Sequence, residues 1–209
     1  MDLYIIGAGD VGGFLAYHVS DMGSFNLKGF LDDDVSKHGK SYYESPILGF
    51  IDDIISVKRP VAVAIAIANP TVKIKITKRL KRNPQILFPT FVHPTVWLGK
   101  NTKVEQGCII YPGVNINYET LISEFSTINM NATIGHNCTV GQCVTLSPSV
   151  NLGGFTEIGD GSFLGIGAST LQGISIGKNS IVGGMSIILQ NVPDDATVVG
   201  NPGRLIKIN

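Results

Sequence analysis

The chain has 209 residues and a net charge of zero, with sixteen basic and sixteen acidic side chains. No positive excess is present to attract nucleic acid, and the longest apolar run, 61–68, is far shorter than the roughly 20 residues that cross a bilayer, so neither partner is expected. The three cysteines are an odd number without metal-ligand spacing, which predicts no metal site and a reducing, cytoplasmic compartment.

Residues 1–85 are predicted to form a small α/β domain. Apolar strand patterns alternate with helical spacing, an order that predicts βαβαβα and a parallel sheet. The strands are expected at 3–6, 27–31 and 61–68, and the helices at 14–22 and 71–81. Ligands of such sheets lie beyond the carboxyl ends of the strands.

The expected ligand-binding ends of these strands carry glycines and polar side chains. They are Gly7, Gly9 and Gly12 of a Gly-x-Gly-x-x-Gly turn, Asp32, Asp33 and Asn69. The turn, with an acidic residue twenty positions later, satisfies a dinucleotide motif. However, three strands supply only one mononucleotide half, so a nucleotide attached to a sugar fits better than NAD. The acidic pair also has the plain interpretation of a solvated strand end.

Residues 86–193 contain a six-residue repeat, followed by a tail at 194–209. From Ile86 to Ile188, seventeen of eighteen positions spaced by six are Ile, Leu or Val, and Thr170 is the exception. Three residues after each of these positions, no Ile, Leu or Val occurs. Stacked hexapeptides of this kind predict a parallel β-helix, in which neighbouring turns complete one another's core.

The corners between the hexapeptides carry two further signals. The residue directly after the large aliphatic is Gly in eight repeats and Asn in two. Because these residues accept a positive φ at least cost, each is predicted to turn the corner in that conformation. Large apolar residues at outward corners predict a contact surface between copies of the chain: Phe125, Met130, Phe155 and Phe163.

The combination of the two halves resembles one family along essentially the whole chain. The matching segments are the glycine turn, Leu31-Asp32-Asp33, 66–69, His93-Pro94, the uninterrupted hexapeptides and Val199-Gly200-Asn201-Pro202. They are similar to the hexapeptide-repeat sugar acetyltransferases, which include sialic acid O-acetyltransferases and the UDP-4-amino-sugar N-acetyltransferases of bacterial surface glycan synthesis. The resemblance implies a left-handed β-helix with three hexapeptides per coil, here six coils. It also implies acetyl-CoA as cosubstrate, a homotrimer with active sites between solenoids, and a nucleotide-sugar bound by the N-terminal domain.

Acetyl transfer needs a base and a donor for the oxyanion. Of four histidines only His136 lies at a solenoid corner, and Ile134-Gly135-His136 occupies the place of the family's catalytic histidine; a plain surface residue is the alternative. Eighteen residues later comes Gly154, whose N–H is the expected oxyanion donor. Gly154 also matches the family's contact with the acetyl carbonyl, although it has the plain interpretation of a turn glycine.

The residue after His136 departs from the family's pattern. The family usually has Asp or Glu there, whereas this chain has Asn137. An amide fixes a tautomer but does not stabilise an imidazolium as an anion does, and the same change in a serine-protease triad costs about 10⁴ in rate. Glu119, eighteen residues before Asn137, is a second candidate for the orienting partner, one strand spacing of about 4.8 Å away. The weakened pair favours an amine as acceptor.

The resemblance also implies further binding residues. With Gly154, those expected to contact acetyl-CoA are Gly165, Ile166, Gly183, Gly184, Asn201 and Pro202, and Asn129 is expected to contact the sugar. Val11 replaces a histidine that some members carry in the glycine turn, so the sugar and its nucleotide stay open. The sequence therefore predicts an acetyl-CoA-dependent sugar N- or O-acetyltransferase. The alternative is a nucleotide-sugar-binding regulatory protein that has lost turnover.

Overall fold

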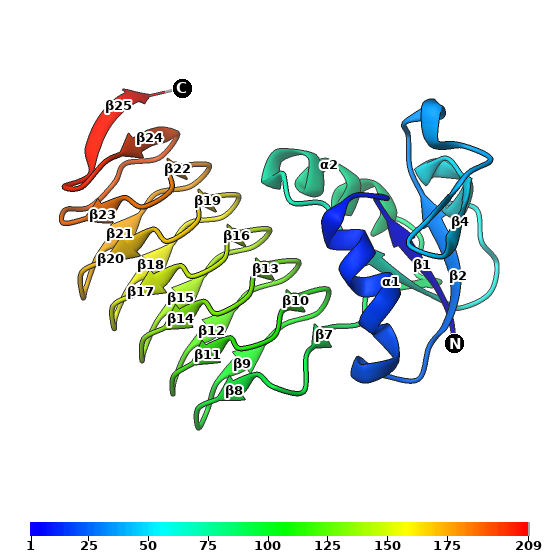
Figure 1. Cartoon of the computed structure of the whole chain (residues 1–209), viewed down its shortest axis with the longest axis horizontal. Coiled ribbons are helices and arrows are strands. Elements are labelled where there is room, and N and C mark those ends of the chain that lie inside the picture. The colour runs from blue at the N-terminus through cyan, green and yellow to red at the C-terminus, as the bar shows by residue number, and fades with distance from the viewer. Residues whose placement is uncertain (209) are drawn as a thin grey trace. The chain divides into compact units, whose positions relative to one another are not determined.

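The computed structural model describes residues 1–208 and divides the chain into two compact units. One unit comprises residues 1–68 and 72–91, and the other comprises residues 69–71 and 92 onward. Figure 1 shows an α/β unit at the start of the chain and a stack of short strands in the rest. The predicted fold class, a Rossmann-like α/β half domain followed by a left-handed parallel β-helix, is confirmed.

Six strands form the sheet of the N-terminal unit: β1 (Asp2–Ile6), β2 (Asn26–Leu31), β3 (Ser41–Tyr42), β4 (Ser45–Gly49), β5 (Val61–Ile65) and β6 (Ile86–Leu87). Their order is β3-β4-β2-β1-β5-β6, and all neighbours are parallel except β3 and β4. Every residue of β5, which lies between β1 and β6, is buried, as expected for a parallel strand with apolar side chains on both faces. The described residues form two α-helices, α1 (Asp10–Met22) and α2 (Pro70–Leu80), and neither has the length and apolar character of a membrane span.

The segment between β2 and β5 differs from the predicted βαβαβα order. It contains two 3₁₀ helices, Val35–Lys37 and Ile51–Ile54, and the β3–β4 hairpin, but no α-helix among these described residues. Aspartate, serine, glycine and proline recur in this segment and favour turns over helix. Gly39 has a φ of 71°, which a continuous α-helix does not allow.

The C-terminal unit is a stack of coils whose strands form three faces. The first face consists of β7 (Phe91–Val92), β10 (Ile109–Ile110), β13 (Thr127–Ile128), β16 (Thr145–Leu146), β19 (Phe163–Leu164), β22 (Ile181–Val182), β24 (Ala196–Val199) and β25 (Arg204–Ile208). The second face consists of β8 (Trp97–Leu98), β11 (Asn115–Ile116), β14 (Thr133–Ile134), β17 (Asn151–Leu152), β20 (Ser169–Thr170) and β23 (Ile187–Ile188). The third face consists of β9 (Lys103–Val104), β12 (Leu121–Ile122), β15 (Thr139–Val140), β18 (Glu157–Ile158) and β21 (Ser175–Ile176).

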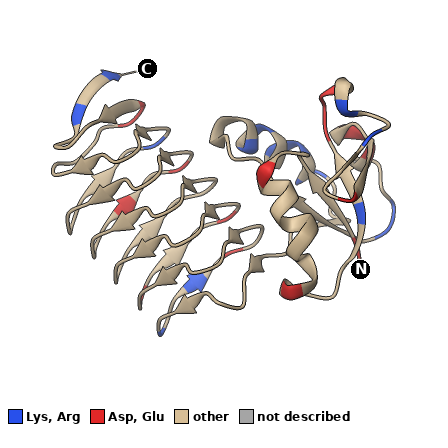
Figure 2. Cartoon of the chain, in the orientation of Figure 1, with Lys and Arg blue, Asp and Glu red and all other residues tan. Residues whose placement is uncertain are grey.

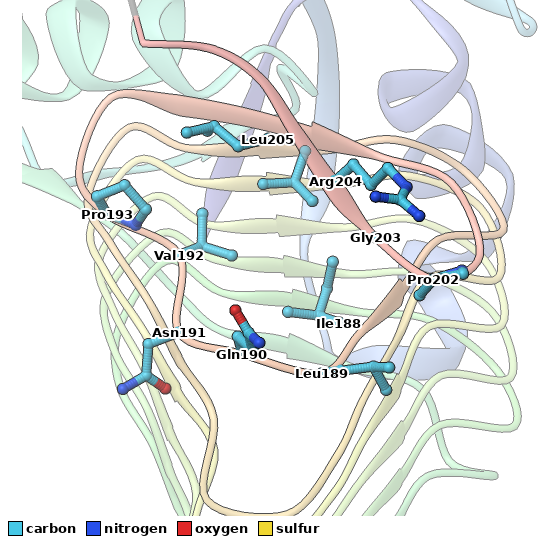
Figure 3. Close-up of a pocket in the computed structure, with 11 residues that line it drawn as sticks. Ile188, Leu189, Gln190, Asn191, Val192, Pro193, Pro202, Gly203, Arg204 and Leu205 are labelled. Atoms are coloured by element: carbon cyan, nitrogen blue, oxygen red, sulfur yellow. The ribbon is translucent and has the colours of Figure 1, made fainter.

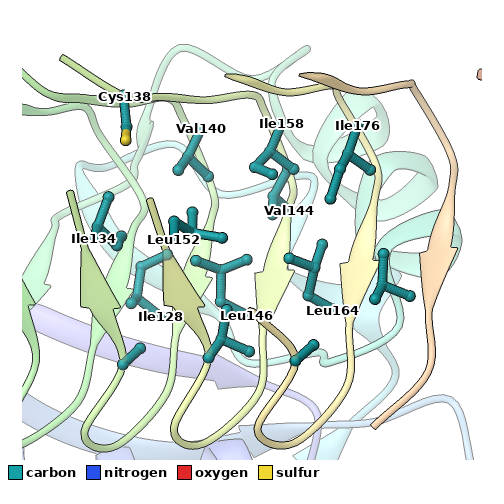
Figure 4. Packing of buried hydrophobic residues seen from close by; sticks show 14 of the residues in the cluster. Ile128, Ile134, Cys138, Val140, Val144, Leu146, Leu152, Ile158, Leu164 and Ile176 are labelled. Carbon is teal, nitrogen blue, oxygen red and sulfur yellow. The ribbon is translucent and has the colours of Figure 1, made fainter. Parts of the chain in front are cut away.

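Strands eighteen residues apart pair in parallel, which aligns the hexapeptide series along each face. Ile134 of β14, for example, pairs with Ile116 of the preceding coil and Leu152 of the next. The aliphatic side chains of the three faces point inward and pack into one continuous core, part of which is drawn in Figure 4. Each coil is therefore stabilised by apolar contacts with its neighbours, which a single coil lacks.

The hexapeptide series and the solenoid do not begin at the same residue. Ile86, the first residue of the series, belongs to β6 and pairs with Val61 in the N-terminal sheet. The solenoid begins with β7, one hexapeptide later. At the other end, β24 pairs in parallel with β22, and β25 pairs antiparallel with β24.

The corners turn at a different residue from the one predicted. Positive φ values occur at the third residue after the core aliphatic, as at Glu119 (58°), Asn137 (55°) and Phe155 (58°), and not at the glycines directly after it. Those glycines are needed for space, since a Cβ on Gly135 would lie 2.5 Å from the backbone nitrogen of Gly154 in the next coil. The prediction of positive φ for them is therefore wrong. Where this third position has a positive φ, from residue 101 to residue 185, no β-branched residue occupies it, as expected for that conformation.

Two of the four predicted contact residues are well exposed. Met130 is 44% exposed and Phe155 is 50% exposed, whereas Phe163 is half-buried. Phe125 is buried, contrary to the prediction, because its ring lies over Gly107 of the preceding coil, where a Cβ would come within 2.5 Å of it. An outward corner in the sequence thus does not guarantee an exposed ring.

Charged side chains are rare on the faces of the solenoid (Figure 2). Among the described strands β7–β24, Lys103 and Glu157 are the charged residues, and both belong to the third face. The second face carries no charged residue on any of its strands.

Candidate active site

His136 lies at the corner between the second and third faces, where the chain leaves β14 and enters β15. Its Nδ1 is 2.9 Å from Oδ1 of Asn137. Asn137 has a left-handed backbone with a φ of 55°, and its N–H donates to the carbonyl of Tyr118 in the preceding coil. Because an amide oxygen only accepts, the neutral imidazole of His136 carries its proton on Nδ1 and has its lone pair on Nε2.

Gly154 lies next to this lone pair, in the following coil. A Cβ at residue 154 would be 2.7 Å from Nε2 of His136 and 2.9 Å from Cε1, so any larger residue would displace the ring. The N–H of Gly154 makes no hydrogen bond to any residue that the structure describes. The eighteen-residue step thus brings the predicted base and the predicted oxyanion donor together.

Two aromatic side chains that the sequence analysis did not assign to the site pack against the imidazole. Tyr118 stacks on His136 with ring centroids 5.2 Å apart and planes 12° apart. Phe155 meets the same ring edge-on, with centroids 4.9 Å apart and an angle of 87°. The eighteen-residue spacing of the coils could have identified both residues from the sequence. Tyr118 precedes His136 by eighteen residues, and Phe155 follows Asn137 by eighteen.

Glu119 does not contact the imidazole. Its Oε1 accepts a hydrogen bond from Nδ2 of Asn101, one coil earlier, at 3.2 Å. Glu119 and Asn137 occupy equivalent positions in successive coils, but their side chains bond in different directions. The geometry therefore places Asn137, and not Glu119, against His136.

The predicted CoA-contacting residues other than Gly154 lie along another corner or beyond it. They are Gly165 and Ile166 after β19, Gly183 and Gly184 after β22, and Asn201 and Pro202 between β24 and β25. Ile166 is 61% exposed, and a Cβ on Gly184 would lie 3.2 Å from its carbonyl oxygen, so the two residues stack in adjacent coils. The first four belong to the corner between the first and second faces. Within one chain they and His136 therefore flank the second face from opposite edges.

Asn129 belongs to that same corner between the first and second faces, since it follows β13. Its Oδ1 accepts a hydrogen bond from the N–H of Met130 at 2.8 Å. Within one chain the structure does not bring Asn129 to His136.

A cavity of about 490 Å³ opens at the C-terminal end of the solenoid (Figure 3). Ile188, Val192 and Val198 line it from the last coils. Pro202, just before β25, and Arg204, its first residue, also line the cavity. His136 is not among its lining residues.

In the N-terminal unit, Asp32 links the glycine turn to the loop after β2. Its carboxylate accepts hydrogen bonds from the N–H of Ala8 at 2.9 Å, the N–H of Asp34 at 2.9 Å and Nζ of Lys37 at 2.8 Å. Partial burial acts to raise the pKa of Asp32, but the hydrogen bonds from Lys37, Asp34 and Ala8 outweigh it and leave the pKa below its usual value. The carboxylate thus has a role within its own unit.

The other predicted residues of the N-terminal site lie in the glycine turn, after β2 and before α2. Gly7 has a φ of 95°, Gly12 packs directly against the Gly7 carbonyl, and Gly9 precedes α1 without a side-chain cap. Asp33 accepts from the N–H of Ile51 at 3.0 Å and lies 3.5 Å from Arg79. Asn69 directly precedes α2 and groups with the C-terminal unit and not with the other predicted residues. In the described part of the chain, no cluster of three or more His, Cys, Asp or Glu side chains has the arrangement of a metal site.

The chain is similar to known proteins in its N-terminal domain and along its whole length. Residues 2–80 match the PglD N-terminal domain family. The acetyltransferase domain of PglB from Neisseria gonorrhoeae FA1090, solved with acetyl coenzyme A, is 26% identical over 98% of each chain, with a TM-score of 0.90. WeeI from Acinetobacter baumannii AYE is 26% identical over 99% of this chain and 100% of its own, with a TM-score of 0.86.

Two weaker comparisons agree with these. PerB from Caulobacter crescentus, solved with CoA and GDP-perosamine, is 22% identical over 99% of this chain and 98% of its own, with a TM-score of 0.90, and this likeness concerns the fold. A 43-residue segment is 46% identical to the serine acetyltransferase of Bacillus pumilus, so the match spans about a fifth of that curated relative (20%). These likenesses support the sugar acetyltransferase family for this chain, and its residues 2–80 match the PglD type of N-terminal domain.

Proposed function

We propose that the protein transfers the acetyl group of acetyl-CoA to an amino group on a nucleotide-linked sugar. The observation that carries the proposal is the tautomer of His136. Its Nδ1–H is held by Asn137, which leaves the lone pair of Nε2 beside Gly154. A general base needs this arrangement of one fixed and one open nitrogen.

The reaction follows from these groups. The sugar amine attacks the thioester carbonyl carbon, and Nε2 of His136 takes a proton from the amine as the C–N bond forms. The N–H of Gly154 stabilises the oxyanion. The C–S bond then breaks, and the proton on Nε2 passes to the departing sulfur of CoA. The imidazole ends neutral, ready for another turnover.

An amine is the favoured acceptor because of Asn137. The amide holds the tautomer without adding a negative charge that would strengthen the base. A neutral amine is already a nucleophile, whereas a hydroxyl depends on proton removal. PglB was solved with acetyl coenzyme A and PerB with CoA and GDP-perosamine, which supports these ligand classes as the first to test. A role in bacterial surface glycan synthesis, inside the cytoplasm, is part of the proposal.

The proposal includes a homotrimer packed through the β-helices. His136 and the expected CoA-contacting stretch lie at different corners of one chain, so a neighbouring copy is needed to bring a base and a CoA corner together. The uncharged second face and the exposed Met130, Phe155 and Ile166 are suited to such packing. Light scattering at micromolar concentration should give three times the chain mass, and a monomer would contradict this assembly.

A thiol-release assay tests the function. Acetyl-CoA is combined with UDP-, GDP- and dTDP-linked amino sugars, and with free sialic acid as the hydroxyl acceptor. We expect CoA release with an amino sugar and none with the N-acetylated sugar as matched control. Release with sialic acid alone would instead establish an O-acetyltransferase.

The loss of the carboxylate beside His136 favours one second candidate, a nucleotide-sugar-binding regulatory protein without turnover. Thermal shift measurements with the nucleotide-sugars and with CoA separate the two. Stabilisation by both ligands supports the enzyme. Stabilisation by a nucleotide-sugar alone, without CoA release, would support the regulatory protein.

A further inference from the structure

The corner at Gly153 departs from the repeat in one backbone hydrogen bond. At every other corner from residue 99 to residue 183, the residue after the core position donates its N–H to the carbonyl of a core aliphatic in the next coil. Gly153 instead donates to the hydroxyl of Thr170, at 3.1 Å. Strands β17 and β20 accordingly pair through one residue each, whereas β14 and β17 pair through two. The irregularity lies immediately beside Gly154.

Thr170, the one polar residue in the aliphatic series, belongs to a closed ring of hydrogen bonds. Its Oγ1 is 3.0 Å from Oγ1 of Thr156, and that hydroxyl donates to the carbonyl of Gly153 at 2.7 Å. Thr156 has one proton, and of its two carbonyl acceptors Gly153 at 2.7 Å is closer than Leu171 at 3.4 Å. With that proton used for Gly153, Thr170 is the donor between the two hydroxyls. Both the N–H and the carbonyl of Gly153 are therefore held by threonine hydroxyls.

A buried thiol supports the same carbonyl. Sγ of Cys138 donates to the Gly153 oxygen at 3.3 Å. Burial raises the pKa of Cys138, so the sulfur keeps its proton and remains a donor. The carbonyl of Gly153 is thus held toward the interior of the solenoid by two side chains.

The ring also fixes the direction of the next N–H. The carbonyl of Gly153 and the N–H of Gly154 belong to one planar trans peptide and point in opposite directions. With the carbonyl held inward, the N–H of Gly154 points away from the interior, at the corner that also carries His136. Two successive glycines have no side chains to restrict the backbone, so hydrogen bonds must do so.

We propose that Thr170 and Thr156 are positioning residues for acetyl transfer. Their hydroxyls hold the Gly153–Gly154 peptide so that the N–H of Gly154 meets the acetyl oxygen as it becomes negatively charged. The inference rests on the proposed function, and the threonines act through their hydrogen bonds to Gly153. An aliphatic residue at position 170 would allow the regular backbone hydrogen bond and release the peptide, which accounts for the break in the series.

The test compares Thr170→Val, which keeps the shape and removes the hydroxyl, with Thr170→Ser, which keeps the hydroxyl. Loss of a whole oxyanion donor lowers kcat by about 10² to 10³. A donor that is present but misdirected should lose part of this, and we expect kcat of Thr170→Val to fall about tenfold. The KM values for both substrates should stay within about twofold, because the interaction acts on the transition state. Thr170→Ser should restore most of kcat.

Ser162→Ala is the matched control for loss of a buried hydroxyl. Ser162 donates to the carbonyl of Gly177 at 2.7 Å, at the corner between the third and first faces. Both variants should melt at a lower temperature than the wild type, but only Thr170→Val should lose kcat. Equal losses of kcat in the two variants would overturn the inference, because the effect would then be one of stability.

Two further outcomes separate this inference from the function on which it rests. If the wild type transfers acetyl groups and Thr170→Val does so at the same rate, the inference fails and the function stands. If the wild type transfers no acetyl group to any acceptor, the function fails and the inference fails with it.

Discussion

The corner at His136 and the corner between the third and first faces use the same repeat position in opposite ways. At the latter, the N–H groups of Gln142 and Lys178 are bonded to carboxylates of the following coil, Asp160 at 2.9 Å and Asp194 at 2.7 Å. At the former, the residue that follows His136 by one coil is Gly154, which has no side chain, and its own N–H is open. Both corners therefore have the same backbone, and the residue one coil later determines their use. An aspartate there binds a corner N–H and stabilises the turn, whereas Gly154 leaves space and an N–H for a substrate.

Among the variants that keep His136, closing the open corner should have the largest effect on kcat. Gly154→Ala places a Cβ 2.7 Å from Nε2 of His136, so the imidazole must move away from the reacting amine. Misplacement of a catalytic group by about 1 Å costs about 10² in rate, and we expect a loss of that size in kcat. Asp160→Ala, which removes a cap at the other corner, is the control and should keep its kcat. An unchanged rate in Gly154→Ala would contradict the assigned geometry.

Removing the stacked ring at the His136 corner should have a smaller effect. Aromatic pairs contribute about 0.5–1.5 kcal/mol, so Tyr118→Ala should lower kcat by about 2- to 10-fold by loosening the imidazole. Tyr118→Phe keeps the ring and should stay close to the wild-type rate. Steady-state kinetics of Tyr118→Ala and Tyr118→Phe show whether the ring is what matters. Equal losses in the two variants would assign the role to the hydroxyl instead of the ring.

Replacing the amide of Asn137 by a carboxylate should make His136 a stronger base. Asn137→Asp puts a negative charge beside Nδ1 and favours the imidazolium, so the acid limb of the pH–rate profile should move to higher pH. Above that limb, we expect kcat to rise about threefold because the base is stronger. Glu119→Gln serves as control, since Glu119 bonds to Asn101. A profile that changes in Glu119→Gln and not in Asn137→Asp would transfer the orienting role to Glu119.

The smallest effect on activity is expected in the N-terminal unit, where Asp32 is already bonded to three donors. Folding lowers the pKa of Asp32 below its usual value of 3.8. The charged carboxylate therefore stabilises the fold above about pH 4, and this stabilisation is lost as the pH falls through the pKa that Asp32 has in the folded state. Asp32→Asn should therefore melt at a lower temperature than the wild type at pH 7, and the difference should shrink below about pH 4. A difference that is independent of pH would contradict the role of the charge. The KM for the sugar should rise while that for acetyl-CoA is kept.

The period of the sequence predicted much of the solenoid and part of its site. A step of eighteen residues places Gly154 beside His136, because strands eighteen residues apart pair in register. The same period did not locate the left-handed corner residue, since that depends on backbone geometry inside the hexapeptide. The period also showed Thr170 only as an exception in the aliphatic series and did not indicate its role. That role depends on a hydrogen bond between the hydroxyls of Thr156 and Thr170, whose directions the spacing of residues does not specify.

The most direct test of the account is the kinetics of His136→Ala, with Gln142→Ala as the matched variant at the other corner. If Nε2 of His136 is the base, kcat should fall by about 10² to 10⁴ while the affinity for acetyl-CoA, measured by calorimetry, stays close to the wild-type value. Gln142→Ala should retain the wild-type kcat. A loss of less than tenfold in His136→Ala would contradict the account.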